Sequence, residues 1–496
     1  MSTLKITEGA LKDEVLVLGL VSTNEKGGLA IESGDLAIDS KSLLVSLNDM
    51  GATGDVDEVI KVPGNSVRLI LFTGLGKKSK TYPLETLRRA AGAASRALNG
   101  TDSATFALPT NELLSLSAVA EGAALGAYVF SDFRGSTKSD HKAAVKTITF
   151  YSKFASNPEA KALLVRAKVI ADYTFLVRDL INTPPSHLTP DAFTKKIAAA
   201  FKSAGGLKAG LKISILDEKQ LKSQGFGGII GVGQGSANPP RLLHISYTPK
   251  TSIKKRFAFV GKGITFDTGG LALKPALGME AMKSDMSGAA AVCAATLAIA
   301  ALKLPIAIET WAPLAENMPS DKATRPSDII TIFGGKTVEV LNPDAQGRLV
   351  LADAIVKAQS GKNKLDGIID VATLTGAQVV ALGTRTSAVM TNNEDFSNEF
   401  LAATARSGEQ FWPMPLPQEL RASLDSPVAD MANIGDRNGG MLVAGLFLKE
   451  FVQQDLPWLH LDIAGPAFNT AKAHGYTPVG GTGIALRSLI TLVEGA

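Results

Sequence analysis

Residues 257–274 read FAFVGKGITFDTGGLALK, an apolar run that leads directly into a loop rich in glycine. The run predicts a buried strand over Arg256–Val260. The loop after it carries Lys262, Asp267 and Lys274. In α/β proteins, ligand sites lie just beyond the carboxyl ends of the strands. This stretch therefore predicts an α/β fold with a polar site at the end of this strand.

Two further aspartates occur in similar surroundings. Asp285 stands in KSDMSGAAAV, where a helix of small residues begins, and Asp344 stands between the expected strand Thr337–Leu341 and the next helix. Aspartate at a helix start is typical of an N-cap, so capping aspartates and surface lysines are one interpretation. The other is a metal site, because carboxylates suit Mg²⁺, Mn²⁺ or Zn²⁺ and two such ions can act together in a hydrolysis. Composition and spacing leave both interpretations open.

Strand-like runs recur along the chain with helical segments between them, which predicts α/β layers. In the second half the expected strands are Leu211–Leu216, Arg241–Tyr247, Arg256–Val260, Ile306–Trp311, Gly367–Val371 and Trp458–Ile463. In the first part they are Glu14–Val21, Ser42–Leu47, Arg68–Phe72 and Lys146–Tyr151, with helices expected over Leu84–Leu98 and Glu112–Tyr128.

A long helical pattern separates these two parts. It covers Asn157–Ile181 and is followed by Pro184 and Pro185, which cannot continue a helix. We therefore expect a smaller N-terminal α/β domain over 1–155, a connecting helix over 156–183 and a larger C-terminal α/β domain with a central mixed sheet over 184–496.

The composition excludes several classes of protein. Of the 496 residues, 45% are hydrophobic and 20% charged, which excludes wholesale disorder. The net charge of +4 is too small to favour nucleic acid as a partner. Cys293 is the single cysteine, so neither a disulfide framework nor a thiolate zinc site is expected. The five histidines form no HExxH motif, so a metal site is expected to rest on carboxylates.

We expect neither a signal peptide nor a membrane span. The first residues, MSTLKITEGALKDEV, lack the apolar segment of a secretory signal. The longest apolar stretch, Ala289–Leu302, is shorter than the roughly 18 residues that a membrane span needs. The sequence thus indicates a reducing, cytoplasmic setting.

Several long motifs resemble the M17 leucyl aminopeptidases, also called cytosol aminopeptidases. They are VGKGITFDTGG, KSDMSGAAAV, NPDAQGRLVLADA, DVATLTGA, RDLINTPPSHLTP, WAPLAENMPSDKATRPSD, ADMANIGDRNGG, HLDIAGPA and GYTPVGGTG. They follow the family's order from about Arg178 to Gly483. The resemblance implies a metal-dependent exopeptidase that hydrolyses the N-terminal peptide bond of peptides and prefers leucine and other apolar residues. It also implies a homohexamer whose sites face an interior cavity.

The resemblance implies two divalent metal ions per chain, Mn²⁺ or Zn²⁺. Lys262, Asp267 and Asp285 match the family's ligands for the more readily exchanged metal. Asp267 also matches the ligand that bridges to the tighter metal, which Asp344 is expected to bind through its side chain and its backbone carbonyl.

Further matches imply catalytic and substrate-binding roles. Lys274 matches the lysine that polarises the scissile carbonyl. Arg348 matches the arginine that holds a bicarbonate ion, the usual candidate for the general base. The residues that match the contacts to the substrate backbone are Thr373, Leu374 and Gly376.

The chain departs from the family in the third motif. The family reads Asn-Thr-Asp-Ala-Glu-Gly-Arg where residues 342–348 of this chain read NPDAQGR. Gln346 thus stands in place of the metal ligand Glu that bridges both ions. An amide offers one neutral oxygen and an NH₂ group where a carboxylate offers two anionic oxygens.

This departure leaves two outcomes. The chain is either an aminopeptidase impaired by Gln346, which binds one metal well and the second poorly, or a catalytically silent oligomeric binding or structural protein on the same scaffold. A third alternative, another two-metal hydrolase such as a phosphoesterase, does not account for the TLTGA match.

Overall fold

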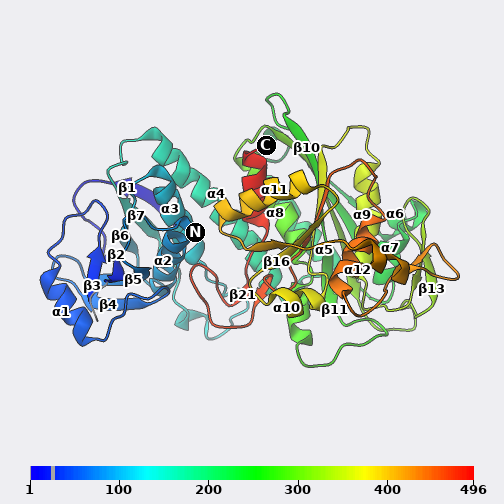
Figure 1. Ribbon diagram of the computed structural model, residues 1–496, viewed down its shortest axis with the longest axis horizontal. Helices are drawn as coiled ribbons and strands as arrows, with labels where there is room; N and C mark the ends of the chain where they lie inside the picture. Colours follow the sequence, from blue (N-terminus) through cyan, green and yellow to red (C-terminus); the bar gives the residue numbers. More distant parts are fainter. Residues whose placement is uncertain (1, 24–27) are drawn as a thin grey trace. The chain divides into compact units, whose positions relative to one another are not determined.

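The computed structural model describes residues 2–23 and 28–496 and divides into two compact units. The first unit runs to Phe175 and also takes in Thr470–Val479, and the second contains Leu176–Asn469 and Gly480–Ala496. Each unit has its own main sheet with helices packed against it (Figure 1). The predicted fold class, an α/β protein with a smaller N-terminal part and a larger C-terminal part built on a mixed sheet, is confirmed.

The first unit is built on a seven-stranded sheet in the order β1-β7-β6-β2-β5-β4, with β3 paired to β2. The strands are β1 (Thr3–Thr7), β2 (Val15–Ser22), β3 (Leu29–Glu32), β4 (Val59–Pro63), β5 (Leu69–Lys77), β6 (Ser103–Ala107) and β7 (Thr147–Tyr151). Only β3 and β4 pair antiparallel to their neighbours. Alternate residues of β2 face opposite sides of the sheet, so Val15 and Val17 join one core cluster and Leu16 and Leu18 the other.

Helices cover both faces of this sheet. Helices α2 (Leu84–Ala97) and α3 (Leu113–Gly126) pack against each other and share a cluster with Val15. The two helices approach very closely at Gly122, because a Cβ added there would lie 1.9 Å from the carbonyl oxygen of Arg88. The long helix α4 (Pro158–Asn182) begins in this unit.

One predicted strand of the first unit is wrong. Ser42–Leu47 lies within a helix, α1 (Lys41–Asp49). Leu43 and Leu47 are one helical turn apart and both pack under β2, whereas Val45 between them is 60% exposed. The apolar residues therefore follow the period of a helix, and a run of leucines and valine was not enough to predict a strand.

A short segment from far along the chain completes the first unit. Tyr476 packs with Leu125 and Phe175, and its hydroxyl donates to Glu85 Oε1 at 2.8 Å. Beside it, Arg96 Nε donates to the carbonyl oxygen of Gly475 at 2.7 Å. No pattern in the sequence predicted that Thr470–Val479 would group with residues of the first unit.

The second unit is built on a nine-stranded mixed sheet in the order β17-β16-β19-β15-β10-β12-β9-β8, with β11 paired to β12. The strands are β8 (Leu211–Leu216), β9 (Arg241–Tyr247), β10 (Lys255–Gly261), β11 (Gly263–Asp267), β12 (Ile306–Asn317), β15 (Gly367–Ala372), β16 (Ser387–Thr391), β17 (Phe411–Pro413) and β19 (Trp458–Asp462). Strands β19, β15, β10 and β12 are parallel, and β11 is parallel to β12. The six strands predicted for this sheet are confirmed, although β12 continues six residues beyond the predicted end at Trp311.

Two helices sandwich the centre of this sheet. Helix α8 (Ser287–Ala301) packs on β10 and β12, and α9 (Gly347–Gln359) packs on the opposite face, in a cluster with Ala258, Val260 and Ile368. The helical stretch Met279–Ala301 is long and apolar enough to cross a membrane by composition, but its most apolar window is 94% buried inside the structure. It is therefore a core helix of the unit.

The remaining elements surround this core. The helices are α5 (Pro190–Ser203), α6 (Glu218–Ser223), α7 (Gly227–Gly233), α10 (Gly376–Leu382), α11 (Glu394–Ser407), α12 (Gly440–Lys449) and α13 (Leu486–Glu494). The small sheets contain β13 (Asp328–Thr331), β14 (Thr337–Val340) and β18 (Met431–Ala432), and β20 (Phe468–Asn469) with β21 (Gly480–Gly481). The carboxyl ends of β10, β11, β12, β15 and β19 meet at one edge of the large sheet.

Candidate active site

The predicted site residues come from the strand ends of the second unit. Lys262 follows β10, Asp267 ends β11 and Thr373 follows β15. Asp285 follows a six-residue 3-10 helix (Met279–Ser284), and residues 344–346 lie between β14 and the start of α9. The structure brings these side chains into one cluster.

The inner part of the cluster is buried: the side chains of Lys262 and Asp285 are 3% and 7% exposed. Lys262 Nζ donates to Asp285 Oδ1 at 2.8 Å and to the carbonyl oxygen of Thr373 at 2.7 Å. The hydroxyl of Thr373 donates to the same oxygen of Asp285 at 2.7 Å. The Lys262 side chain passes over the start of α9, where a Cβ on Gly347 would lie 2.6 Å from its Cε. Position 347 therefore requires glycine for Lys262 to reach Asp285.

The outer part of the cluster is more open. Lys274 Nζ pairs with Asp267 Oδ2 at 2.9 Å and with Asp344 Oδ1. The side chains of Lys274 and Asp344 are 22% and 32% exposed, against 3% for Asp267. Burial lowers the pKa of Lys274, but the two carboxylates outweigh it and hold the pKa above its usual value. Lys274 is thus a charged ammonium group that faces the accessible side.

Gln346 lies between the two buried carboxylates. Its Nε2 donates to Asp267 Oδ2 at 3.0 Å and to Asp285 Oδ2 at 3.1 Å. Its Oε1 is buried and has no hydrogen-bond partner among the residues that the structure describes. The amide therefore presents a buried, unpaired acceptor at the centre of the cluster.

The alternative interpretation of Asp285 as a helix cap is wrong. Helix α8 begins at Ser287 after Met286, and the Asp285 carboxylate turns instead to Lys262 and Thr373. Burial raises the pKa of Asp285 to about 6, although Lys262 opposes this shift. A carboxyl group held away from water among cations is typical of a functional cluster.

The donor set fits divalent metal ions. Asp267, Asp285 and Asp344 supply hard anionic oxygens, and Gln346 Oε1 is a buried acceptor that still lacks a partner. Within residues 2–23 and 28–496, no three His, Cys, Asp or Glu side chains are arranged as a finished ligand group. The ammonium groups of Lys262 and Lys274 instead lie against the carboxylates and balance their charge.

Arg348 is the second residue of α9 and follows Gln346 by two positions. Its Nη1 donates to the carbonyl oxygen of Asn433 at 2.8 Å, and its guanidinium lies over the ring of Phe447. Burial lowers the pKa of Arg348 to about 10, and the charge of Asp462 opposes this shift. Arg348 makes none of the recorded hydrogen bonds to the three clustered aspartates.

The loop over Thr373–Gly376 is anchored by Asp462. Asp462 Oδ1 accepts from the backbone N–H of Leu374 at 3.1 Å, and its Oδ2 accepts from the hydroxyl of Thr375 at 2.8 Å. Thr375 Oγ1 in turn accepts from the N–H of Gln378 and caps α10. The loop is therefore fixed at the strand ends, next to Lys262 and Asp285.

Sequence reasoning missed several residues that hold this site in place. Asn317 donates to Asp267, and Asn433 holds the backbone at Leu341 and Asn342. Within the large sheet, Asp370 on β15 accepts a hydrogen bond from Trp458 Nε1 and pairs with His460 on β19. The other ring nitrogen of His460, Nε2, has no hydrogen-bond partner among the described residues. The position of Asn317 at the end of a strand could have identified it, but the predicted strand stopped too early.

The chain is similar to known proteins over most of its length. Residues 175–490 match the model of the cytosol aminopeptidase family catalytic domain, and residues 17–137 match that family's N-terminal domain. The probable cytosol aminopeptidase of Streptomyces avermitilis is 47% identical over 501 residues, covering 98% of this chain and 96% of its own. That of Rhodococcus erythropolis is 46% identical over 492 residues, covering 98% and 95%.

Solved structures are similar over the same length. The bottromycin maturation enzyme BotP in complex with Mn is 35% identical with a TM-score of 0.85, covering 98% of this chain and 99% of its own. A mutant of tomato leucine aminopeptidase is 28% identical with a TM-score of 0.85, covering 100% and 97%. Both domain models and the full-length relatives lead to one conclusion: the chain belongs to the cytosol aminopeptidase family.

Proposed function

We propose that this chain is a metal-dependent aminopeptidase that hydrolyses the N-terminal peptide bond of peptides, with preference for leucine and other apolar residues. Aminopeptidase activity follows from the family and from relatives that share nearly half of all residues over the full length. The observation that carries the assignment to this site is the convergence of three aspartates and two lysines around Gln346.

The metal ions are proposed to be two Mn²⁺ or Zn²⁺ ions per chain. Lys262, Asp267 and Asp285 would hold one ion, and Asp267 with Asp344 and Gln346 the other. The presence of Mn in the structure of a related protein and the oxygen-rich donor set support this proposal. When bound, such ions supply Lewis-acid activation of a water nucleophile and of the scissile carbonyl.

Lys274 is proposed to stabilise the negative charge that develops on the carbonyl oxygen of the scissile bond. Its charge is retained because Asp267 and Asp344 raise its pKa. Its partial exposure places the ammonium group where a substrate can reach it. A fixed cation in a largely buried site stabilises a developing oxyanion more strongly than the same cation in water.

Substrate positioning is proposed for Thr373, Leu374 and Gly376. Asp462 and Thr375 fix the backbone of this loop, so its peptide groups offer donors and acceptors in a set orientation. An extended peptide backbone can bind along such a segment by main-chain hydrogen bonds.

Arg348 is proposed to hold a bicarbonate ion that acts as the general base. The guanidinium is permanently charged even with its lowered pKa, and its planar set of donors suits a bidentate anion. The carbonyl of Asn433 and the ring of Phe447 fix the orientation of the guanidinium.

Gln346 is proposed to replace a glutamate that bridges both metals in the family, and so to weaken the second metal site. The amide donates to Asp267 and Asp285, whereas a carboxylate in this place would bind metal ions instead. We expect the unsubstituted protein, called the parent below, to bind one ion tightly and the second weakly.

The test is hydrolysis of leucine amide with added Mn²⁺ or Zn²⁺ by the parent and by Gln346→Glu. We expect Gln346→Glu to be at least about 10-fold faster, since changes near metal ligands alter activity on the order of 10–100-fold. The exposed Gln224→Glu is the control and should match the parent. Equal rates for the parent and Gln346→Glu would show that the bridging carboxylate is dispensable. If neither is active although folded, the chain is a silent binding or structural protein.

Three further properties are part of this proposal. We propose that the chain forms a homohexamer. We also propose a cytosolic location, in keeping with the names of the relatives, and a division of the chain into 1–155, a connecting helix and 184–496.

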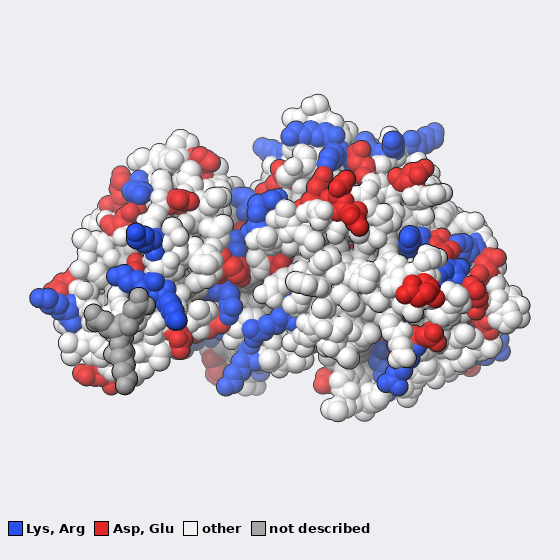
Figure 2. Space-filling view, viewed as in Figure 1, with Lys and Arg blue, Asp and Glu red and all other residues white. Residues whose placement is uncertain are grey.

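Nucleic acid is not expected as a partner. On the face drawn in Figure 2, basic and acidic side chains are interspersed and form no single basic tract.

A further inference from the structure

Asn317 is a buried residue at the end of β12, in the second unit. It is 4% exposed and stands opposite Asp267 in the register of β11 and β12. The register shifts by one residue between Ile264 and Phe266, so Thr265 forms a bulge in β11. This bulge brings Asp267 opposite Asn317, because a regular β11 would place Phe266 there.

The side-chain amide of Asn317 holds two segments of the site at once. Its Nδ2 donates to Asp267 Oδ1 at 2.9 Å and to the carbonyl oxygen of Pro343 at 3.2 Å. Pro343 directly precedes Asp344, so one NH₂ group connects the end of β11 to the loop that leads into α9. The backbone of Asn317 adds to this, because its carbonyl accepts from both the N–H and the hydroxyl of Thr268.

The two carboxylate oxygens of Asp267 have different partners. Oδ1 accepts from Asn317 and from the N–H of Gly269 at 2.9 Å. Oδ2 faces Lys274 and Gln346 at 2.9 Å and 3.0 Å. Asn317 and the N–H of Gly269 thus bind one oxygen of the Asp267 carboxylate in the orientation that turns the other oxygen toward the cluster.

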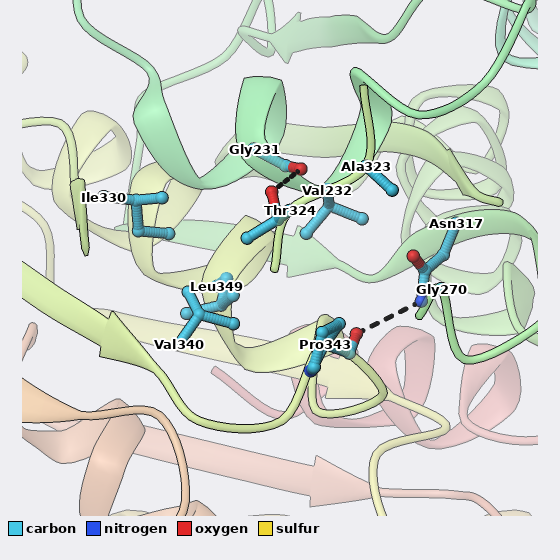
Figure 3. A pocket seen from close by; sticks show the side chains of 10 residues that line it. All are labelled: Gly231, Val232, Gly270, Asn317, Ala323, Thr324, Ile330, Val340, Pro343 and Leu349. Carbon is cyan, nitrogen blue, oxygen red and sulfur yellow. Dashed lines mark hydrogen bonds between the residues drawn. The ribbon is translucent and has the colours of Figure 1, made fainter. Parts of the chain in front are cut away.

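The space beside the Asn317 amide has a mostly apolar lining. It borders a cavity of about 10 Å³ that also touches Gly270 and Pro343 (Figure 3). Apart from Asn317, the only polar side chain in the lining is that of Thr324, whose hydroxyl donates to the carbonyl of Gly231. Rotating the amide toward this space would leave its NH₂ group without a partner, which is unfavourable in a buried position.

We propose that Asn317 is a positioning residue that presents Asp267 Oδ2 to the metal ions and fixes the Pro343–Asp344 backbone beside it. This inference rests on the proposed metal site. A residue that orients a ligand commonly changes metal affinity 10–100-fold when it is replaced. Asn317→Asp removes both hydrogen bonds and places a negative charge against Asp267, so we expect Mn²⁺ to bind on the order of 10-fold or more weakly.

The test measures Mn²⁺ binding to the full-length, metal-stripped protein by calorimetry and by the EPR signal of bound Mn²⁺. The variant Asn317→Asp is compared with Asn392→Asp. Asn392 also donates to a backbone carbonyl, that of Leu456, but it follows β16 and binds the start of β19, in a different part of the unit. We expect weaker binding and a changed EPR signal for Asn317→Asp alone, with a melting temperature of the metal-free protein no lower than that of the control. If Asn317→Asp does not fold, Asn317→Ala, which removes the donors without adding charge, is judged by the same criteria.

Each other outcome overturns the inference. A folded variant that binds Mn²⁺ within two-fold of the parent shows that Asn317 does not position the ligand. Loss of folding in both variants assigns Asn317 a structural role. A parent that binds no Mn²⁺ refutes the proposed metal site as well, whereas a parent that binds and a variant that binds equally refute only the role of Asn317.

Discussion

Lys274 stands between two carboxylates on the open side of the cluster, and its charge is the feature that the proposed chemistry uses. Replacing it by Gln removes the cation but keeps a side chain of similar length. We expect kcat to fall by about 10²–10³, as for loss of one group that stabilises an oxyanion, with a smaller change in KM. Initial rates of leucine amide hydrolysis check this, with the exposed Lys254→Gln as control. An equal fall in kcat for both variants would show that Lys274 has no specific role in the mechanism.

Asp353 gives a separate prediction for stability at different pH. It is fully buried on α9 and accepts from the N–H groups of Ile229 and Phe333, each at 2.7 Å. Burial raises its pKa to about 7 although these donors oppose the shift. A raised pKa in the folded state means that the folded protein binds the proton more tightly than the unfolded chain, so the stabilisation is present below about pH 4 and is lost as the pH rises through about 7.

We therefore expect the free energy of unfolding of the parent to fall between pH 4 and 7 relative to Asp353→Asn. The full difference is up to about 4 kcal/mol at 1.36 kcal/mol per pKa unit. Urea unfolding of both metal-free proteins at several pH values measures it. A difference between the two proteins that stays constant over this range would contradict the raised pKa.

At the scale of elements, the start of α9 is shaped by the passage of Lys262. A Cβ on Gly347 would meet Cε of Lys262 at 2.6 Å and Nζ at 2.7 Å. These atoms belong to the end of a flexible side chain, so Gly347→Ala should displace Lys262 from Asp285 and leave the fold intact. We expect Mn²⁺ binding to weaken on the order of 10-fold while the melting temperature changes little.

Gly361→Ala is the matched control for Gly347→Ala, because a Cβ at Gly361 meets no atom within 4 Å. Calorimetric titration with Mn²⁺ compares the two variants. Unchanged metal binding in a folded Gly347→Ala protein would show that Lys262 has room to move without affecting the ligands.

The strands also show which parts of the fold and of the site sequence patterns predict. The buried strands β10, β15 and β19 were predicted closely because their apolar runs end at polar residues. Strand β12 was predicted to stop at Trp311, yet it continues to Asn317 and contains Pro313, a residue that strands rarely accommodate. The motifs identified the charged residues of the cluster, but Asn317, Asn433 and Asp462 depend on register and loop contacts that lie far apart along the chain.

At the scale of the whole molecule, the most unexpected feature is that Thr470–Val479 packs with the first unit. It lies inside the stretch that resembles the family's catalytic domain, and sequence position alone gave no reason to separate it. Tyr476 is 9% exposed and packs with Leu125 and Phe175. Local patterns describe single elements, and they carry no information on which sheet a connecting segment joins.

We expect Tyr476→Ala to destabilise the first unit by about 3 kcal/mol, the loss typical of a large aromatic side chain removed from a core. Chemical unfolding followed by circular dichroism measures this. Val479→Ala in the same segment should change stability by less than about 0.5 kcal/mol, because Val479 is 59% exposed. Equal stability of both variants would mean that the segment contributes little to the unit.

A ribosome makes the sheet and helices of the first unit long before it makes Tyr476. At roughly 5–20 residues per second, tens of seconds separate the emergence of Phe175 from that of Tyr476. Throughout this time the apolar surface around Leu125 and Phe175 lacks its partner. A nascent chain that stalls or is cut short before Thr470 therefore keeps this surface exposed, which makes it a target for chaperones and proteases until the segment up to Val479 has been made.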